Sequence, residues 1–137
     1  MIVLDASALV ELLLETDAGQ QVADRIDDPE VGLHVPHLAD VEVTQALRRF
    51  ARDGDIEDAE AEAALDNLRA LDLQRHSHEL LLDRVWQLRD NLTAYDAVYV
   101  ALTEALDGQL LTSDARLARA AGSRARVELI ETTRKRL

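Results

Sequence analysis

Four acidic side chains are placed where they could cooperate in one site. Asp5 directly follows the first apolar run of the chain, and Asp114 follows a later apolar run by two residues. Asp96 lies in an almost wholly apolar stretch, where an ionised carboxylate is unfavourable unless it is paired or binds a metal ion. Glu42 lies between two valines of an amphipathic segment. Taken singly, the aspartates could be helix caps and Glu42 a solvated side chain.

Gathered in one cleft, these carboxylates predict a divalent metal site. Packed carboxylates repel one another, and their pKa values rise unless a cation neutralises them. No basic residue stands immediately beside Asp5, Asp96 or Asp114, so we expect these acids to lack a basic partner. Oxygen ligands favour Mg²⁺ or Mn²⁺ over Zn²⁺, and such an ion can activate water against a phosphodiester. Three nearby hydroxyl residues are expected to hold the carboxylates by hydrogen bonds: Ser7, Thr112 and Ser113.

Short strands alternate with helices along the chain and must position these acids. Apolar runs predict strands at 2–4, 33–35, 71–74, 109–112 and 127–130. Helical patterns cover 8–14, 18–26 with Asp17 as its N-cap, 39–52, 58–71, 80–92, 95–106 and 115–121. Strands that are apolar throughout favour a parallel sheet covered on both faces, with ligands at the carboxyl ends of the strands. We therefore expect one α/β domain over residues 1–137.

Composition narrows the classes of function. The chain has 137 residues and no cysteine, which excludes disulfides, thiolate metal sites and cysteine nucleophiles. No apolar run approaches membrane-spanning length and no signal-peptide pattern is visible, so a cytoplasmic protein is expected. The net charge of −12 argues against a broad phosphate-binding surface but allows a local one. Arginines, which suit bidentate phosphate contacts, cluster at 48, 49 and 52, at 116, 119, 124 and 126, and at 134 and 136 beside Lys135.

Three segments and one acid together resemble the PIN-domain nucleases. The segments are MIVLDASAL at 1–9, LTAYDAVYVALTE at 92–104 and LLTSDARLARA at 110–120. Glu42 falls where that family keeps its second acid. The order, the spacing and the chain length fit along the whole sequence, and within the family a chain of this length is similar to the VapC toxins of toxin–antitoxin pairs.

The resemblance implies a fold, an activity and partners. The fold would be a PIN-like α/β/α sandwich, and the activity that of an Mg²⁺- or Mn²⁺-dependent endoribonuclease that hydrolyses RNA with metal-activated water. Asp5, Asp96 and Asp114 would be the metal ligands, with Glu42 completing the catalytic set. A homodimer and a VapB-type antitoxin are also implied. Because the chain is acidic, local arginines must hold the RNA, and the best placed in the sequence are Arg116 and Arg119.

Other interpretations fit the sequence less well. A receiver domain needs a lysine after a late strand, but the only lysine is Lys135, and a haloacid-dehalogenase phosphatase needs Asp-x-Asp where this chain has Asp5-Ala6-Ser7. The four histidines are expected to be ordinary surface residues. A catalytically silent PIN-fold interaction module remains an alternative, in which the apolar face of helix 58–71 binds a partner instead of packing internally. Divalent-metal binding distinguishes it from a nuclease.

Overall fold

The computed structural model describes residues 1–122 and 124–131. Within these ranges, five parallel strands form one sheet in the order β3-β2-β1-β4-β5. The elements in chain order are β1 (Ile2–Leu4), α1 (Ala6–Leu13), α2 (Asp17–Arg25), β2 (Leu33–Pro36), α3 (Leu38–Arg52), α4 (Asp58–Ala70), β3 (Leu73–His76), the 3₁₀ helix η1 (Glu79–Leu81), α5 (Leu82–Gln87), α6 (Ala94–Leu106), β4 (Gln109–Thr112), α7 (Ala115–Ala120) and β5 (Arg126–Leu129).

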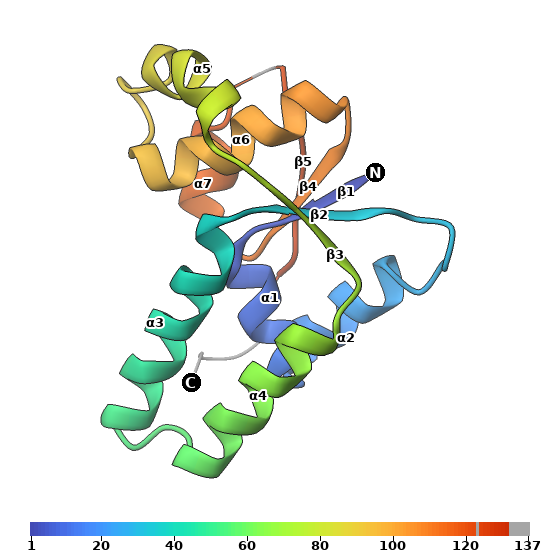
Figure 1. The fold of residues 1–137 in the computed structure, drawn as a ribbon, viewed down its shortest axis with the longest axis vertical. Helices are drawn as coiled ribbons and strands as arrows, with labels where there is room; N and C mark the ends of the chain where they lie inside the picture. The colour runs from blue at the N-terminus through green and yellow to red at the C-terminus, as the bar shows by residue number, and fades with distance from the viewer. Residues whose placement is uncertain (123, 132–137) are drawn as a thin grey trace.

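Helices cover both faces of the sheet, which confirms the predicted α/β/α sandwich. Figure 1 shows α1 to α4 on one side of the strands and α5 and α6 on the other. Helix α6 buries every residue from Ala97 to Thr103 and contacts β1, β2 and β4. Strand β1 is buried along its whole length, as expected for a central strand covered on two faces.

The order of the strands determines where a ligand site can form. From β1 the chain moves outward through β2 to β3, then returns to the other side of β1 to form β4 and β5. Strands β1 and β4 are therefore neighbours at the point where the strand order reverses. Ligands of open α/β sheets bind beside the carboxyl ends of the strands at such a point. Asp5 follows β1 and Asp114 follows β4, so both acids lie at this edge.

Helices α1 and α2 approach each other closely at a glycine. A Cβ added to Gly19 would lie 2.0 Å from the backbone oxygen of Glu11, so no other residue fits there without backbone movement. The predicted N-cap of α2, Asp17, is wrong by one residue. The Thr16 hydroxyl accepts the Gly19 N–H at 3.0 Å, and Asp17 is the first helical residue. Serine, threonine and aspartate all cap well, so the local sequence did not separate the two positions.

The predicted helix at 80–92 is much shorter in the structure. Its first turn is the 3₁₀ helix η1, α5 ends at Gln87, and turns follow to residue 91. Asp90 and Asn91 favour turns because their side chains compete for backbone hydrogen bonds. The turns also allow Leu92 to be buried, with 5% of its surface exposed. Smaller differences are that β3 begins two residues later than predicted, β2 includes Pro36 and β5 covers 126–129.

The apolar face of α4 packs inside the protein. Ala64 and Leu68 are buried, and the helix contacts α1 and α3. This face is therefore not available for the partner binding that the silent-module alternative assigned to it. None of the helices in the described ranges combines the length and hydrophobicity that a bilayer crossing needs.

Candidate active site

Asp5 is held rigidly at the end of β1. Its Oδ1 accepts hydrogen bonds from the Ser7 hydroxyl at 2.7 Å and the Ala8 N–H at 2.9 Å, and its Oδ2 accepts the Thr112 hydroxyl at 2.5 Å. Only 4% of the residue is exposed. Burial raises the pKa of Asp5 to about 6. The three hydrogen bonds lower this pKa and so oppose the effect of burial, whereas the charge of Asp114 raises it further. The residue is thus both a helix cap and a buried acid.

The predicted supporting residues join the ends of β1 and β4. Thr112 donates to Asp5 and also accepts the Asp114 N–H at 3.0 Å. Ser7 accepts the Ser113 N–H at 3.0 Å, and its hydroxyl oxygen lies 3.3 Å from that of Thr112. The Ser113 hydroxyl oxygen is buried, with no hydrogen-bond partner among the described residues. Ser7 and Thr112 therefore contact the acid directly, whereas Ser113 contributes its backbone.

Asp96 and Asp114 meet at one arginine, which corrects the expectation that they lack a basic partner. Arg116 Nη2 donates to Asp96 Oδ2 at 3.1 Å and lies 3.5 Å from Asp114 Oδ2. The Thr93 hydroxyl accepts the Asp96 N–H and begins α6, so Asp96 itself is not the cap. Asp114 caps α7 by accepting the Arg116 N–H at 2.9 Å. Arg116 thus contacts Asp114 through both its backbone N–H and its side chain.

Glu42 joins the cluster through a tyrosine that the sequence analysis missed. The Tyr99 hydroxyl donates to Glu42 Oε1 at 2.6 Å. Partial burial raises the pKa of Glu42, the Tyr99 hydrogen bond opposes this, and the charge of Asp96 raises it further. Burial and the Glu42 carboxylate raise the pKa of Tyr99, with smaller contributions from Asp5 and Asp96. The signal was present in the sequence, because Tyr99 follows Asp96 by three residues and so lies on the same side of a buried helix.

The four acids therefore form one electrostatically coupled cluster at the carboxyl edge of β1 and β4. As the side chains stand, no three Asp, Glu or His residues of the described ranges are arranged to hold a metal ion. The donor set nevertheless suits a hard divalent cation, because every candidate ligand is a carboxylate oxygen and two of them already share one cation, Arg116. Burial is the main cause of the raised pKa values of Asp5 and Glu42, and the charges of Asp114 and Asp96 add to it, so a cation bound in the cluster would favour the ionised carboxylates.

The remaining predicted basic residues do not contribute equally. Arg119 lies exposed in the last turn of α7, and the basic residues 134–136 lie outside the described residues.

The prediction that the histidines are ordinary surface residues is wrong for His34, which is 5% exposed and has its Nδ1 2.9 Å from His76 Nε2. Asp40, which lies two residues before Glu42 on α3, pairs instead with Arg75, with 2.7 Å between Asp40 Oδ2 and Arg75 Nε.

The sequence of this chain is similar to those of known ribonucleases. The PIN-domain family model matches residues 2–123. Ribonuclease VapC9 of Mycobacterium tuberculosis is 44% identical over 119 residues, which cover 85% of this chain and 88% of that protein. Ribonuclease VapC1 of the same organism is 43% identical over 129 residues, 93% of this chain and 96% of that protein. Ribonuclease VapC12 is 42% identical over 130 residues, 95% and 99% of the two chains.

Two solved structures agree with these relatives. PAE2754 from Pyrobaculum aerophilum matches with a TM-score of 0.65 and 26% identity over 92% of this chain and 82% of its own. VapBC2 from Rickettsia felis, solved bound to a DNA fragment from their promoter, matches with a TM-score of 0.69 over 94% and 98% of the two chains. At 12% identity, the latter likeness shows the fold alone. The family match and the sequence relatives together show that this chain belongs to the PIN-domain family and, within it, to the VapC ribonucleases.

Proposed function

We propose that this protein is a metal-dependent endoribonuclease, the toxin of a VapBC-type toxin–antitoxin pair. The observation that carries the proposal is the coupled cluster of Asp5, Glu42, Asp96 and Asp114 at the edge where β1 and β4 end. The identity of 42–44% to VapC ribonucleases over most of the chain supports RNA as the substrate.

Asp5, Asp96 and Asp114 would bind Mg²⁺ or Mn²⁺, and hydrogen bonds or ion pairs orient the carboxylate of each. The hydroxyls of Ser7 and Thr112 orient Asp5, while Asp96 and Asp114 face a shared cation position that Arg116 now contacts. When bound, such an ion supplies activation of water and stabilisation of the leaving oxygen of the phosphodiester.

Glu42 has a separate role in this proposal. The Tyr99 hydroxyl holds Glu42 Oε1, which leaves Oε2 to complete the ligand set or to orient the attacking water. Partial burial raises the pKa of Glu42, and a carboxylate with a raised pKa accepts a proton more readily than a solvated one.

The proposed partners follow from the VapC relatives. RNA is the proposed substrate and a VapB-type antitoxin the proposed inhibitor. The proposed location of the protein is the cytoplasm. A homodimer is also proposed, and four exposed apolar side chains around α5 and the start of α6 give it a surface: Leu80, Leu82, Trp86 and Tyr95. Exposed apolar residues gathered in this way are typical of protein–protein contacts.

RNA cleavage by the purified chain tests the proposal. Cleavage is expected with Mg²⁺ or Mn²⁺, lost with EDTA, and lost in Asp96→Asn but retained in Asp90→Asn, which makes the same change at an exposed turn position. Equal cleavage in all samples would reject the assignment. Absence of cleavage together with absence of Mn²⁺ binding by calorimetry would instead establish the catalytically silent module.

A further inference from the structure

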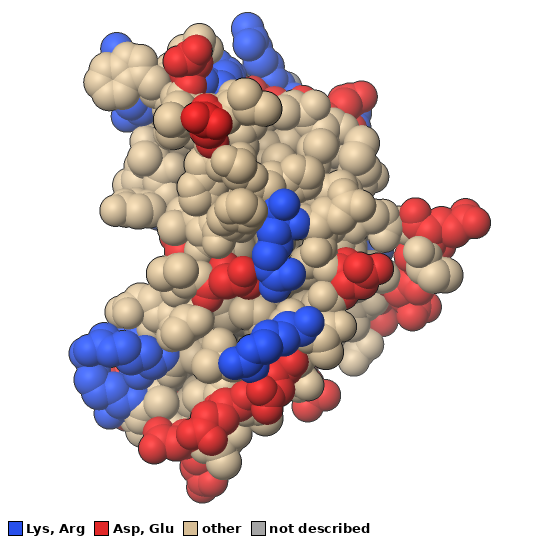
Figure 2. Space-filling model, in the orientation of Figure 1, with Lys and Arg blue, Asp and Glu red and all other residues tan. Residues whose placement is uncertain are grey.

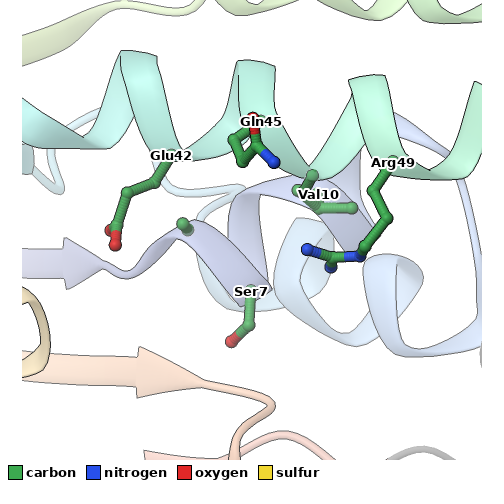
Figure 3. Close-up of a pocket in the computed structure, with 7 residues that line it drawn as sticks. Ser7, Val10, Glu42, Gln45 and Arg49 are labelled. Atoms are coloured by element: carbon green, nitrogen blue, oxygen red, sulfur yellow. The ribbon is translucent and has the colours of Figure 1, made fainter.

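A solvent-open cleft of about 270 Å³ extends from the acidic cluster between α1 and α3. Ser7 and Val10 line it from α1, and Glu42, Gln45 and Arg49 line it from α3. Figure 3 shows Glu42 and Arg49 extending from the same helix toward α1, while the Ser7 hydroxyl points away from α3. The cleft therefore shares Ser7 and Glu42 with the proposed active site and continues away from it.

The spacing on α3 gives the cleft a charge order. Glu42, Gln45 and Arg49 follow one another by three and four residues, which places them on one face of the helix. Arg49 is seven residues beyond Glu42, which corresponds to roughly 10 Å along the helix axis. A carboxylate thus lies at the acidic end of the cleft, an amide in the middle and a guanidinium at the far end.

The Arg49 guanidinium lies over the Phe50 ring, with its carbon 5.4 Å from the ring centre, and is otherwise open to an anion. Its side chain is exposed, and within residues 1–122 and 124–131 no carboxylate lies within ion-pair distance of Arg49 or of the adjacent Arg48. Arg52, one turn further on, lies 3.5 Å from Asp53, which offsets its charge. Figure 2 shows basic side chains gathered over this end of α3, on a chain whose net charge is −12. Arg116, by contrast, is occupied by two carboxylates.

We propose that the cleft between α1 and α3 binds the RNA strand next to the scissile phosphate, with Arg49 holding a neighbouring phosphate. This inference rests on the proposed RNA cleavage. The guanidinium fork matches two phosphate oxygens, and phosphates recur along a strand, so one phosphate at the acids brings another within reach of Arg49. Gln45 can both donate to and accept from the intervening nucleotide. Arg49 and Gln45 are thus substrate-positioning residues.

Salt-dependent RNA binding tests this role. The probe is a short fluorescein-labelled single-stranded RNA of mixed sequence, because a phosphate contact is independent of sequence. All variants carry Asp96→Asn to keep the RNA intact, and anisotropy is measured in Mg²⁺ over a range of salt concentrations. Arg69→Ala is the matched control, since it removes the same charge from an exposed position of α4 that does not line the cleft.

Arg49→Ala is expected to weaken RNA binding about tenfold and to reduce the slope of log K against log salt by about 0.7, the value for one phosphate contact on a single strand. Arg49→Lys should restore the slope but only part of the affinity, because lysine keeps the charge and loses the fork. The urea midpoint should not change, since Arg49 is exposed.

Two results overturn the inference without touching the proposed function. One is that Arg49→Ala has the same RNA affinity and the same slope of log K against log salt as Arg69→Ala, although the chain with native Asp96 cleaves RNA. The other is that Arg49→Ala binds RNA normally but loses binding to the antitoxin, which would assign the cleft to a protein segment. If the unsubstituted chain neither binds nor cleaves RNA, the proposed function fails and this inference fails with it.

Discussion

Replacing Asp5 with asparagine separates what this residue does for catalysis from what it does for stability. Asparagine has the same shape, and its oxygen can still accept from Ser7 and Ala8, while its amide can donate to the Thr112 oxygen. The buried negative charge is removed. Cleavage should be lost, yet the folded protein should become more stable in the absence of metal.

The magnitude follows from the raised pKa. A rise in the pKa of Asp5 from 3.8 to about 6 means that the folded state binds its proton more tightly than the unfolded chain, which corresponds to about 3 kcal/mol. Folding stability is therefore lost as the pH rises from 3.8 to about 6, and the full penalty is present above that range. Asp5→Asn avoids it, so its free energy of unfolding should exceed that of the wild type by up to about 3 kcal/mol at about pH 8.

Urea unfolding in EDTA measures this difference. At about pH 5, still above the sequence pI of 4.6, the advantage of Asp5→Asn should fall to about half. Added Mn²⁺ should then stabilise the wild type and leave the variant unchanged, because a ligand stabilises only the state that binds it. A variant that is less stable than the wild type by the same amount at both pH values would refute the reasoning, since the hydrogen bonds to the carboxylate would then outweigh the penalty of burying it.

Three further substitutions test other parts of the structure. Tyr99→Phe removes the hydroxyl bonded to Glu42 and should lower the free energy of unfolding by about 1–2 kcal/mol in urea at neutral pH, whereas an unchanged value would mean that water replaces the bond. Gly19→Ala should destabilise the protein by about 3 kcal/mol in the same assay because its Cβ meets the Glu11 backbone; wild-type stability would show that α1 and α2 can separate freely. Arg116→Ala should tighten Mn²⁺ binding about fivefold by calorimetry, because it frees two carboxylates from a competing cation. The control is Arg119→Ala, which removes an exposed arginine from the last turn of α7. Equal Mn²⁺ binding by the two variants would contradict that competition.

Local patterns in the sequence were sufficient for the order of elements and the positions of the acids. A strand that is apolar throughout must be buried, so the runs ending before Asp5 and at Thr112 predicted central parallel strands. The carboxyl ends of parallel strands share one edge, so the sequence alone predicts that Asp5 and Asp114 lie together. The apolar surroundings of Asp96 and the position of Glu42 between two valines made both of them candidates, and the resemblance to PIN-domain nucleases, borne out by the family match, joined all four acids in one predicted site.

Other features depend on side chains that are distant in sequence or on competition between local alternatives. Thr16 and Asp17 cap equally well by type, and only the packing of α2 against α1 selected Thr16. The residues from 88 onward could continue a helix, but burying Leu92 required turns. In both cases the local free-energy difference is small, so tertiary packing decides.

The site itself divides in the same way. Asp5 and Asp114 lie just beyond the ends of β1 and β4 because the apolar residues before them form those strands. Their positions can therefore be read from the sequence. That Arg116 contacts Asp96 and Asp114, or that Tyr99 donates to Glu42, depends on the directions in which side chains from separate elements point after the sheet and helices have packed. The order of residues along the chain supplies the acids, whereas the packing of separate elements supplies the groups that neutralise, orient and border them.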